Sequence, residues 1–211
     1  TVFVLAPFCP KSFCSLITFQ NFIAKPFLSS VSFILGIFLA YCLDQIKFGK
    51  SIFLVILISP LAIMPVVSAL TWRTMFNPLY GILNSILQYF GFDGLEWVTD
   101  TTSALTWITV VDIWQWTPFC LLLIYAGLKT IPIDIKESAS LDGISSLKEL
   151  IYISLPILFN LLLITLIFRF MEAFKTFDSI MVITQGGPGN ATETMVIRSY
   201  YTGFRWYKPE I

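Results

Sequence analysis

The sequence predicts an all-α polytopic membrane protein. Hydrophobic residues make up 56% of its 211 residues and charged residues only 12%, and the mean hydropathy is +0.81. An ordinary globular domain is about 25% charged, and an apolar helix of about 20 residues is long enough to cross a bilayer. Four stretches reach or approach that length, so we expect about four full spans and, after them, a further helical start outside the membrane.

Each predicted span is followed by a more polar segment. Lys and Pro residues interrupt the apolar run before the first span, so that span is short. Pro60 and Pro65 lie inside the second span and predict a kink that neighbouring helices accommodate. The four spans are Phe27–Leu43, Ser51–Phe76, Ser103–Leu128 and Leu155–Phe174.

Two charged residues lie within these spans. Asp112 is in the third span and Arg169 in the fourth. A charge that faces lipid is costly, so both side chains are expected to face the bundle interior or a polar path. A structural ion pair or a position near the membrane surface explains them as well as a role in transport does.

The charges of the loops predict the orientation. Lys47 and Lys50 follow the first span, Lys129, Lys136 and Lys148 follow the third, and Asp93, Glu96 and Asp100 follow the second without any basic residue. Cytoplasmic loops of membrane proteins are enriched in Lys and Arg. The first and third loops, and with them segment 132–156, are therefore expected to face the cytoplasm.

Two features are expected on the other side of the membrane. Ile82, Ile86 and Phe90 recur every four residues, with Leu83 and Leu87 beside them, which predicts an amphipathic helix at the outer surface or capping the bundle. After the fourth span, the Gly-Gly-Pro-Gly sequence of residues 186–189 excludes a continuous helix. It predicts an external turn with a new helical start near Thr192 and Glu193.

Several kinds of chemistry are poorly supported. The chain contains no His, and its four cysteines (Cys9, Cys14, Cys42 and Cys120) show no C-x-x-C spacing, so we expect no metal site and no catalytic residues. No GxxxxGK[ST] sequence occurs, so we expect no ATP site in this chain. The net charge of zero gives no indication of nucleic acid as a partner.

Segment 132–156 predicts a compact helix-turn-helix. A first helix can extend from Ile133 to Leu141, with Gly143 as a left-handed stop. Ser146 and Glu149 have the S-x-x-E spacing of a capping box that starts a second helix. Helices this short need tertiary or partner contacts to stay folded. On these grounds alone, a docking element and a simple inter-span loop are evenly matched.

The same segment resembles the EAA loop of binding-protein-dependent ABC importer permeases. The pattern of that loop is E-A-A-x3-G-x9-I-x-L-P, and Ser138 replaces its first Ala with another small residue. The remaining positions fit in register over 20 residues: Glu137, Ala139, Gly143, Ile153, Leu155 and Pro156.

The resemblance extends over most of the chain, from about Gly36 to Phe204, whereas residues 7–30 match poorly. The stretches GIFLAYCLDQIKFGKSIF, WRTMFNPLYGILN, WQWTPFCLLLIYAGLKTIP and FDSIMVITQGGPGNATET look like the carbohydrate branch of the family, in particular its maltose/glycerol-phosphate-type first permease subunit. Such permeases have about six core spans. The resemblance thus implies a single type I permease domain over residues 1–211 that is incomplete, lacking the first and last spans, with a cytoplasmic coupling loop at 132–156.

The resemblance also implies a function and partners. The protein would be a multi-pass subunit in the cytoplasmic (inner) membrane of a prokaryote, paired with a second permease subunit, two ABC ATPases that bind the ATP, and an external solute-binding protein. It would move a carbohydrate (a sugar, an oligosaccharide or a glycerol phosphate) by alternating access. The residues expected to couple it to the ATPase are Glu137, Ser138, Ala139, Asp142, Gly143, Ile153, Leu155 and Pro156.

A carbohydrate path would use aromatic faces and a few polar groups. The candidates are Trp72, Trp114, Trp116, Tyr125 and Asn160, with Trp107 and Asn84 as weaker ones. Aromatic residues also form interfacial belts and packing contacts, so none of them is specific.

Three alternatives remain. One is an ABC permease for a solute other than a sugar. Another is a secondary transporter, which would need internal repeats and intramembrane ion ligands. A membrane enzyme would need a constellation of catalytic groups. Neither of the last two has support in the sequence.

Overall fold

The computed structural model describes residues 30–46, 48–101 and 103–205, and no strand occurs among them. By its internal contacts the chain divides into two compact units, which are described separately. Among the described residues, unit 1 contains Met64–Asp112 and 173–205, and unit 2 contains 30–63 and Ile113–Glu172. The long helix α6 (Ala104–Thr130) contributes its first turns to unit 1 and the rest to unit 2.

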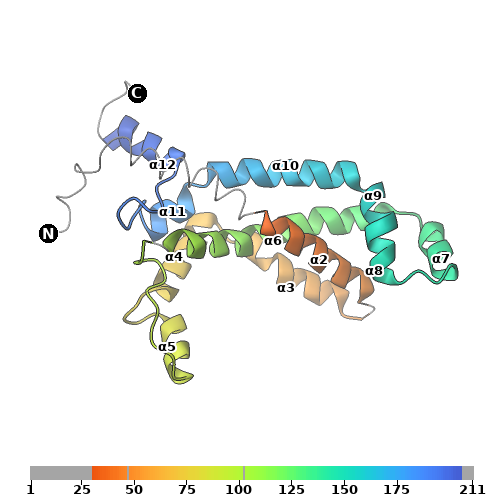
Figure 1. The fold of residues 1–211 in the computed structure, drawn as a ribbon, viewed down its shortest axis with the longest axis horizontal. Helices are drawn as coiled ribbons and strands as arrows, with labels where there is room; N and C mark the ends of the chain where they lie inside the picture. Colours follow the sequence, from red (N-terminus) through yellow and green to blue (C-terminus); the bar gives the residue numbers. More distant parts are fainter. Residues whose placement is uncertain (1–29, 47, 102, 206–211) are drawn as a thin grey trace. The chain divides into compact units, whose positions relative to one another are not determined.

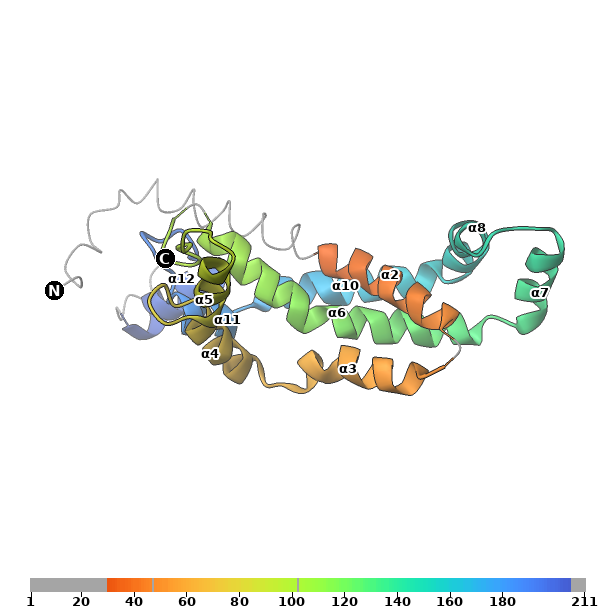
Figure 2. The same cartoon turned by 90° about the horizontal axis from the view of Figure 1, so that it is seen from below.

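Unit 2 is a bundle of apolar helices with a helical hairpin at one end (Figures 1 and 2). Helices α2, α6 and α10 form the bundle, and α7 and α8 lie at the end where α2 and α6 finish. Besides its part of α6, the elements of the unit are α2 (Val31–Gln45), α3 (Lys50–Ala62), α7 (Ile133–Leu141), α8 (Ser146–Glu149), the π-helical turn η2 (Leu150–Ser154), α9 (Leu155–Ile157) and most of α10 (Phe159–Lys175).

Small side chains bring α2 close to α6. Ser32, Gly36 and Ala40 recur every four residues on α2 and are buried. A Cβ atom built on Gly36 would lie only 2.6 Å from the Cβ of Cys120 on α6. In membrane bundles, where lipid removes most of the hydrophobic driving force, such small-x3-small stripes allow the backbone contact that holds helices together.

Unit 1 is organised around aromatic side chains. Its other elements are α4 (Pro65–Met75), α5 (Ile82–Tyr89), α11 (Asp178–Ile183), α12 (Met195–Tyr200) and the π-helical turn η3 (Tyr201–Arg205). Helices α4 and α11 pack together. Phe76 lies within 6.3 Å of Trp97 and of Trp107, centroid to centroid, and the two indole rings meet edge to face at 4.6 Å.

The predicted third span is confirmed. Helix α6 (Ala104–Thr130) is the only single helix among the described residues that is long and apolar enough to cross a membrane. Two bent pairs would also qualify if each is one span, and the shorter α2 is apolar. The start of the predicted first span at Phe27, like the poorly matching residues 7–30 apart from Ser30, lies outside the described residues.

The second span is not the single kinked helix that was predicted. It is divided into α3 and α4, because Ile63 and Met64 have extended backbones (ψ 131° and 136°) immediately before Pro65. A residue before proline is driven out of the helical conformation, and Pro65 then starts α4 at its first turn. The amide nitrogen of Gln115 on α6 donates 2.8 Å hydrogen bonds to the carbonyl oxygens of Pro60 and Ile63 at this break. The carbonyl of Pro60 also accepts the N–H of Ile63 at 3.4 Å.

Replacing Gln115 by methionine is expected to destabilise the folded protein by about 1–2 kcal/mol, because it removes a buried donor to the carbonyls of Pro60 and Ile63 while keeping the side-chain shape. This corresponds to an apparent melting temperature in detergent that is lower by about 2–8 °C. Gln45→Met is the matched control, since Gln45 lies exposed at the end of α2. Equal melting temperatures for the two variants would show that the amide does not support the break.

The fourth span begins later than predicted. Leu155 and Pro156 belong to α9, which continues the helix that starts at Ser146, and an 80° bend at Leu158 separates it from α10. Pro156 has no N–H group, and the helix widens to the π-helical turn η2 just before it. Most of the predicted fourth span is therefore α10, which is long enough to cross a membrane only if the bent pair counts as one span.

The two segments that were predicted to lie on the outer side of the membrane agree only in part with the predicted helices. Helix α5 is present, but Ile82, Ile86 and Phe90 are exposed, whereas Leu83 and Leu87 pack on the core. The helix expected near Thr192 and Glu193 starts at Met195. Helix α11 before the turn was not predicted, because its six residues are too few to show a period.

The two charged residues of the spans are buried, as expected. Asp112 is 2% exposed and Arg169 is 1% exposed. In unit 2, Nε of Arg169 donates a 2.6 Å hydrogen bond to the hydroxyl of Ser32, and its guanidinium lies 5.9 Å from the ring of Trp116. Arg169 thus contacts α2 and α6 rather than reaching for the membrane surface.

Candidate functional site

The hairpin between α6 and α10 forms as the sequence predicted in its first arm. Helix α7 extends from Ile133 to Leu141, and Gly143 then adopts a left-handed backbone with φ of 70°. The N–H of Ile144 reaches back to the carbonyl of Ala139 at 3.1 Å, as in a Schellman motif. Only glycine takes this conformation readily, so Gly143 decides where the helix ends and the turn begins.

The capping box predicted for the second arm is wrong. The N-cap of α8 is Ser145, whose extended backbone (ψ 148°) precedes the first helical residue Ser146, and its side chain makes no capping hydrogen bond. Glu149 is therefore one residue too far along the helix to complete a box. A capping box needs the Ser at the cap itself, and the spacing S-x-x-E does not show which of two adjacent serines occupies it.

The two sides of α7 differ in exposure. Ala139 is 4% exposed and the side chain of Lys136 is 23% exposed, so these residues lie on the side that packs against the other elements of unit 2. Glu137 and Ser138 are exposed, and the Ser138 hydroxyl donates a 2.7 Å hydrogen bond to the carbonyl of Asp134. Ala139, one of the residues expected to couple the chain to the ATPase, is buried within this chain.

Large apolar side chains are exposed on the hairpin. Their exposed fractions are 66% for Ile133, 88% for Leu141, 55% for Leu147 and 75% for Tyr152. Asp142 and Gly143 are also exposed, at the tip between the two arms. Apolar side chains gathered on one element mark an interaction surface more often than scattered ones do.

The last part of the predicted motif lies where the second arm meets α10. Ile153 and Leu155 are half-buried and Pro156 is exposed. Leu155 and Pro156 line a shallow apolar groove together with Ile151, Phe159 and Leu162. Ile153, Leu155 and Pro156 therefore lie at the connection between the second arm and α10. Glu137, Ser138 and Ala139 lie on the first arm, and Asp142 and Gly143 at the hairpin tip.

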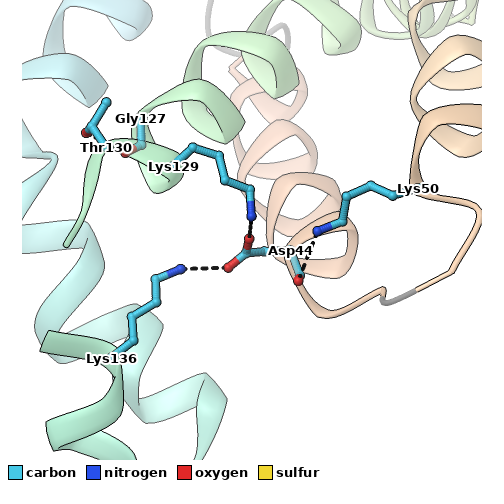
Figure 3. A network of polar contacts seen from close by, with 6 residues as sticks. All are labelled: Asp44, Lys50, Gly127, Lys129, Thr130 and Lys136. Carbon is cyan, nitrogen blue, oxygen red and sulfur yellow. Dashed lines mark hydrogen bonds and ion pairs between the residues drawn. The ribbon is translucent and has the colours of Figure 1, made fainter. Parts of the chain in front are cut away.

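A carboxylate that the sequence analysis did not single out joins this hairpin to two other helices (Figure 3). Asp44, in the last turn of α2, accepts Lys129 at 2.6 Å on one oxygen and Lys136 at 2.8 Å on the other. Its backbone carbonyl accepts the ammonium of Lys50 at 3.3 Å. In the sequence, Asp44 is the one acidic residue beside the loop that contains Lys47 and Lys50. That position does not reveal its partners, which lie 85 and 92 residues away along the chain.

Asp44 lies beyond the end of the predicted span at Leu43, and its carboxyl pKa is lowered. Burial raises this pKa, but the hydrogen bonds and charges of Lys129 and Lys136 together outweigh burial. A lowered pKa in the folded state means that the pairing stabilises the protein above the ordinary pKa of 3.8 and is lost only when the pH falls through the lower value. Asp44 is therefore ionised throughout the physiological range.

The residues predicted for a solute path are divided between the two units. Trp72 and Trp107 pack in the aromatic core of unit 1. The amide of Asn84 is only 3% exposed and forms hydrogen bonds with Trp97 and with the backbone of Leu95, so it holds the loop after α5 together.

Two of the candidates in unit 2 lie beside charged side chains. Trp116 lies beside Arg169, and the ring of Tyr125 lies 5.3 Å from the ammonium of Lys129 and 5.7 Å from that of Lys50. Trp114 and Asn160 are exposed. Structural contacts thus account for Trp116 and Tyr125 without a solute, and the path itself stays a prediction.

Apolar helices, a bent second span and an exposed hairpin before the last span define this chain as a polytopic α-helical membrane protein. It belongs to the family described as the binding-protein-dependent transport system inner membrane component, whose model matches residues 27–206.

Relatives of known name lie in the same family. The chain is 37% identical to the trehalose/maltose transport system permease protein MalF of Thermococcus litoralis, over 81% of this chain and 58% of that protein. It is 34% identical to the sn-glycerol-3-phosphate transport system permease protein UgpA of Agrobacterium fabrum, over 82% of this chain and 59% of that protein. The chain thus spans somewhat less than three fifths of the length of these relatives.

The fold has a counterpart among solved structures. A bacterial ABC transporter involved in the import of the acidic polysaccharide alginate matches with a TM-score of 0.85 at 20% identity, over 95% of this chain and 71% of the other. The alginate transporter in complex with an alginate pentasaccharide-bound periplasmic protein matches with a TM-score of 0.82 at 21% identity, over 95% and 70%. At this identity the match establishes the fold of an ABC importer permease.

Proposed function

We propose that this chain is the transmembrane permease subunit of an ATP-driven importer of a carbohydrate or a glycerol phosphate. The observation that carries the proposal is the hairpin of residues 132–156, which has the E-x-A-x3-G-x9-I-x-L-P register and a left-handed glycine at its tip. The exposed apolar side chains of its two arms support a docking role rather than that of a simple connecting loop.

The partners follow from the same features. A separate ATPase would hold the ATP and receive the hairpin, with Glu137, Ser138, Asp142 and Gly143 exposed at the contact. An external solute-binding protein would deliver the solute, and a second permease subunit would complete the path. The excess of lysine in the first and third loops supports a cytoplasmic position for the hairpin. The paired Asp44 and Lys136 support a common side for these two loops.

The solute class is inferred from the relatives. The names of two of them state trehalose/maltose and sn-glycerol 3-phosphate, and a fold counterpart imports alginate. These solutes share a polyhydroxylated backbone, which aromatic faces and polar groups recognise.

The test is uptake by the full-length protein assembled with its partner subunits in vesicles. We expect ATP-dependent uptake of at least one of trehalose, maltose and sn-glycerol 3-phosphate, and its loss when Glu137 is replaced by lysine, because the exposed charge is reversed at the docking surface. Asp93→Lys is the control, since Asp93 is an exposed acid in the second loop. No uptake of any of the three, with an intact assembled complex, would contradict the solute class. Unchanged uptake by Glu137→Lys would contradict the docking role.

A further inference from the structure

The hairpin is connected to the other helices of unit 2 in two different ways. Helix α7 follows α6 after only Ile131 and Pro132, so the chain itself joins α7 to α6. Helix α2 is remote in sequence, and the ion pair of Asp44 with Lys136 forms a polar link between it and α7. A movement of α7 therefore reaches α6 through the backbone, whereas its transfer to α2 depends on side chains.

The ion pair is placed to carry such a movement. Lys136 directly precedes the exposed Glu137. Lys136 therefore faces the other helices of unit 2, whereas Glu137 faces outward. The Asp44 side chain is 16% exposed and both of its oxygens are engaged, one with α6 and one with α7. Figure 3 shows the carboxylate between the two ammonium groups, with the third lysine on its backbone oxygen. A carboxylate that is only 16% exposed and is held by two ammonium groups is more constrained than one in an exposed single pair.

We propose that Asp44 is a positioning residue for coupling, which links the hairpin to α2 so that a displacement of α7 moves α2 together with α6. The proposal rests on the proposed function of the hairpin. Lys50 completes the arrangement, because its ammonium fixes the carbonyl of Asp44 from the start of α3. The last turn of α2, the end of α6, the first turn of α3 and the hairpin thus share one charged centre.

The lysines offer a matched set of variants. Lys136→Met removes the link from Asp44 to α7, whereas Lys129→Met removes the link to α6, which the chain already joins to α7. Asp44→Asn removes both ion pairs. The experiment uses the full-length protein in the assembled complex and measures solute taken up per ATP hydrolysed, with whichever of trehalose, maltose or sn-glycerol 3-phosphate the unmodified complex transports.

We expect Asp44→Asn and Lys136→Met to lower the ratio of uptake to hydrolysis at least about fivefold, the lower end of typical coupling between sites. Lys129→Met is expected to retain more than about half of the ratio. The double variant Asp44→Asn with Lys136→Met should be no worse than either single variant, because residues that act through one contact are not additive. A merely structural ion pair would instead lower the amount of assembled complex and leave the ratio unchanged.

Three results would overturn the inference: a ratio close to that of the unmodified complex for Lys136→Met, an equal loss for Lys129→Met, or additive losses in the double variant. If Asp44→Asn yields no assembled complex, the comparison of the two lysine variants still decides. Failure of the proposed function gives a different result, since the unmodified complex itself would then show no ATP-dependent uptake.

Discussion

Replacing Gly143 by valine in the full-length protein is expected to lower ATP-driven uptake by about five- to thirtyfold while membrane insertion stays intact. The physical reason is the left-handed backbone of Gly143 (φ 70°). This conformation costs a residue with a side chain roughly 1–2 kcal/mol, which corresponds to that factor in the population of the turn. No atom lies within 4 Å of a Cβ built at this position, so the effect is backbone strain at the hairpin tip and not a clash that unfolds the bundle.

Two variants separate coupling from strain. Gly91→Val introduces the same kind of strain (φ 81°, no atom within 4 Å), but in the loop after α5. Uptake by this variant is expected to stay within about twofold of the unmodified protein, because a surface substitution outside the hairpin has a small effect. Gly143→Asn should retain most of the uptake, since asparagine tolerates the left-handed conformation. Measured uptake that is equal for Gly143→Val and Gly91→Val would refute a special role of the hairpin tip.

Adding a methyl group at Gly36 is expected to destabilise unit 2 by about 1–3 kcal/mol, the usual cost of overpacking. A Cβ at this position would lie 2.6 Å from the Cβ of Cys120 and 3.1 Å from the backbone nitrogen of Leu121. Backbone atoms of α6 cannot rotate away, so α2 must separate from α6. The better helix propensity of alanine offsets up to about 1 kcal/mol of this cost.

The measurement is the apparent melting temperature of Gly36→Ala in detergent, with Gly127→Ala and Gly203→Ala as controls. The atom nearest to a Cβ at Gly127 is the end of the flexible Leu161 side chain, and no atom lies within 4 Å at Gly203. The expected order of destabilisation is therefore Gly36, then Gly127, then Gly203. A melting temperature of Gly36→Ala equal to that of Gly203→Ala would show that the close approach of α2 to α6 does not contribute to stability.

Features that depend on local chemistry were predictable from the sequence. The limits of α7 and the turn at Gly143 follow from helix propensity and from the freedom of glycine, which act over a few neighbouring residues. The third span follows from its continuous apolar length. The hairpin motif is equally local, since all its positions lie within 20 residues.

Predictions were wrong or silent where the outcome depended on a distant group. The sequence located Pro60 and Pro65 but not the amide of Gln115, which satisfies the carbonyls of a complete break between α3 and α4. Ser146 and Glu149 had the correct spacing for a cap, yet the helix starts one residue earlier in register, at a cap formed by Ser145. The small-residue stripe of α2 was not singled out from the sequence, and only packing shows that it faces α6.

By itself, the sequence determined that this is a helical membrane protein, which stretches are apolar and where the hairpin of residues 132–156 turns, because hydrophobic length and backbone preference are properties of short segments. Only the tertiary structure decided that Ala139 is buried, that Tyr125 lies beside lysines and that Asp44 joins α2 to the hairpin. Those outcomes depend on which side chains folding brings together, and the partners of Asp44 lie 85 and 92 residues away along the chain.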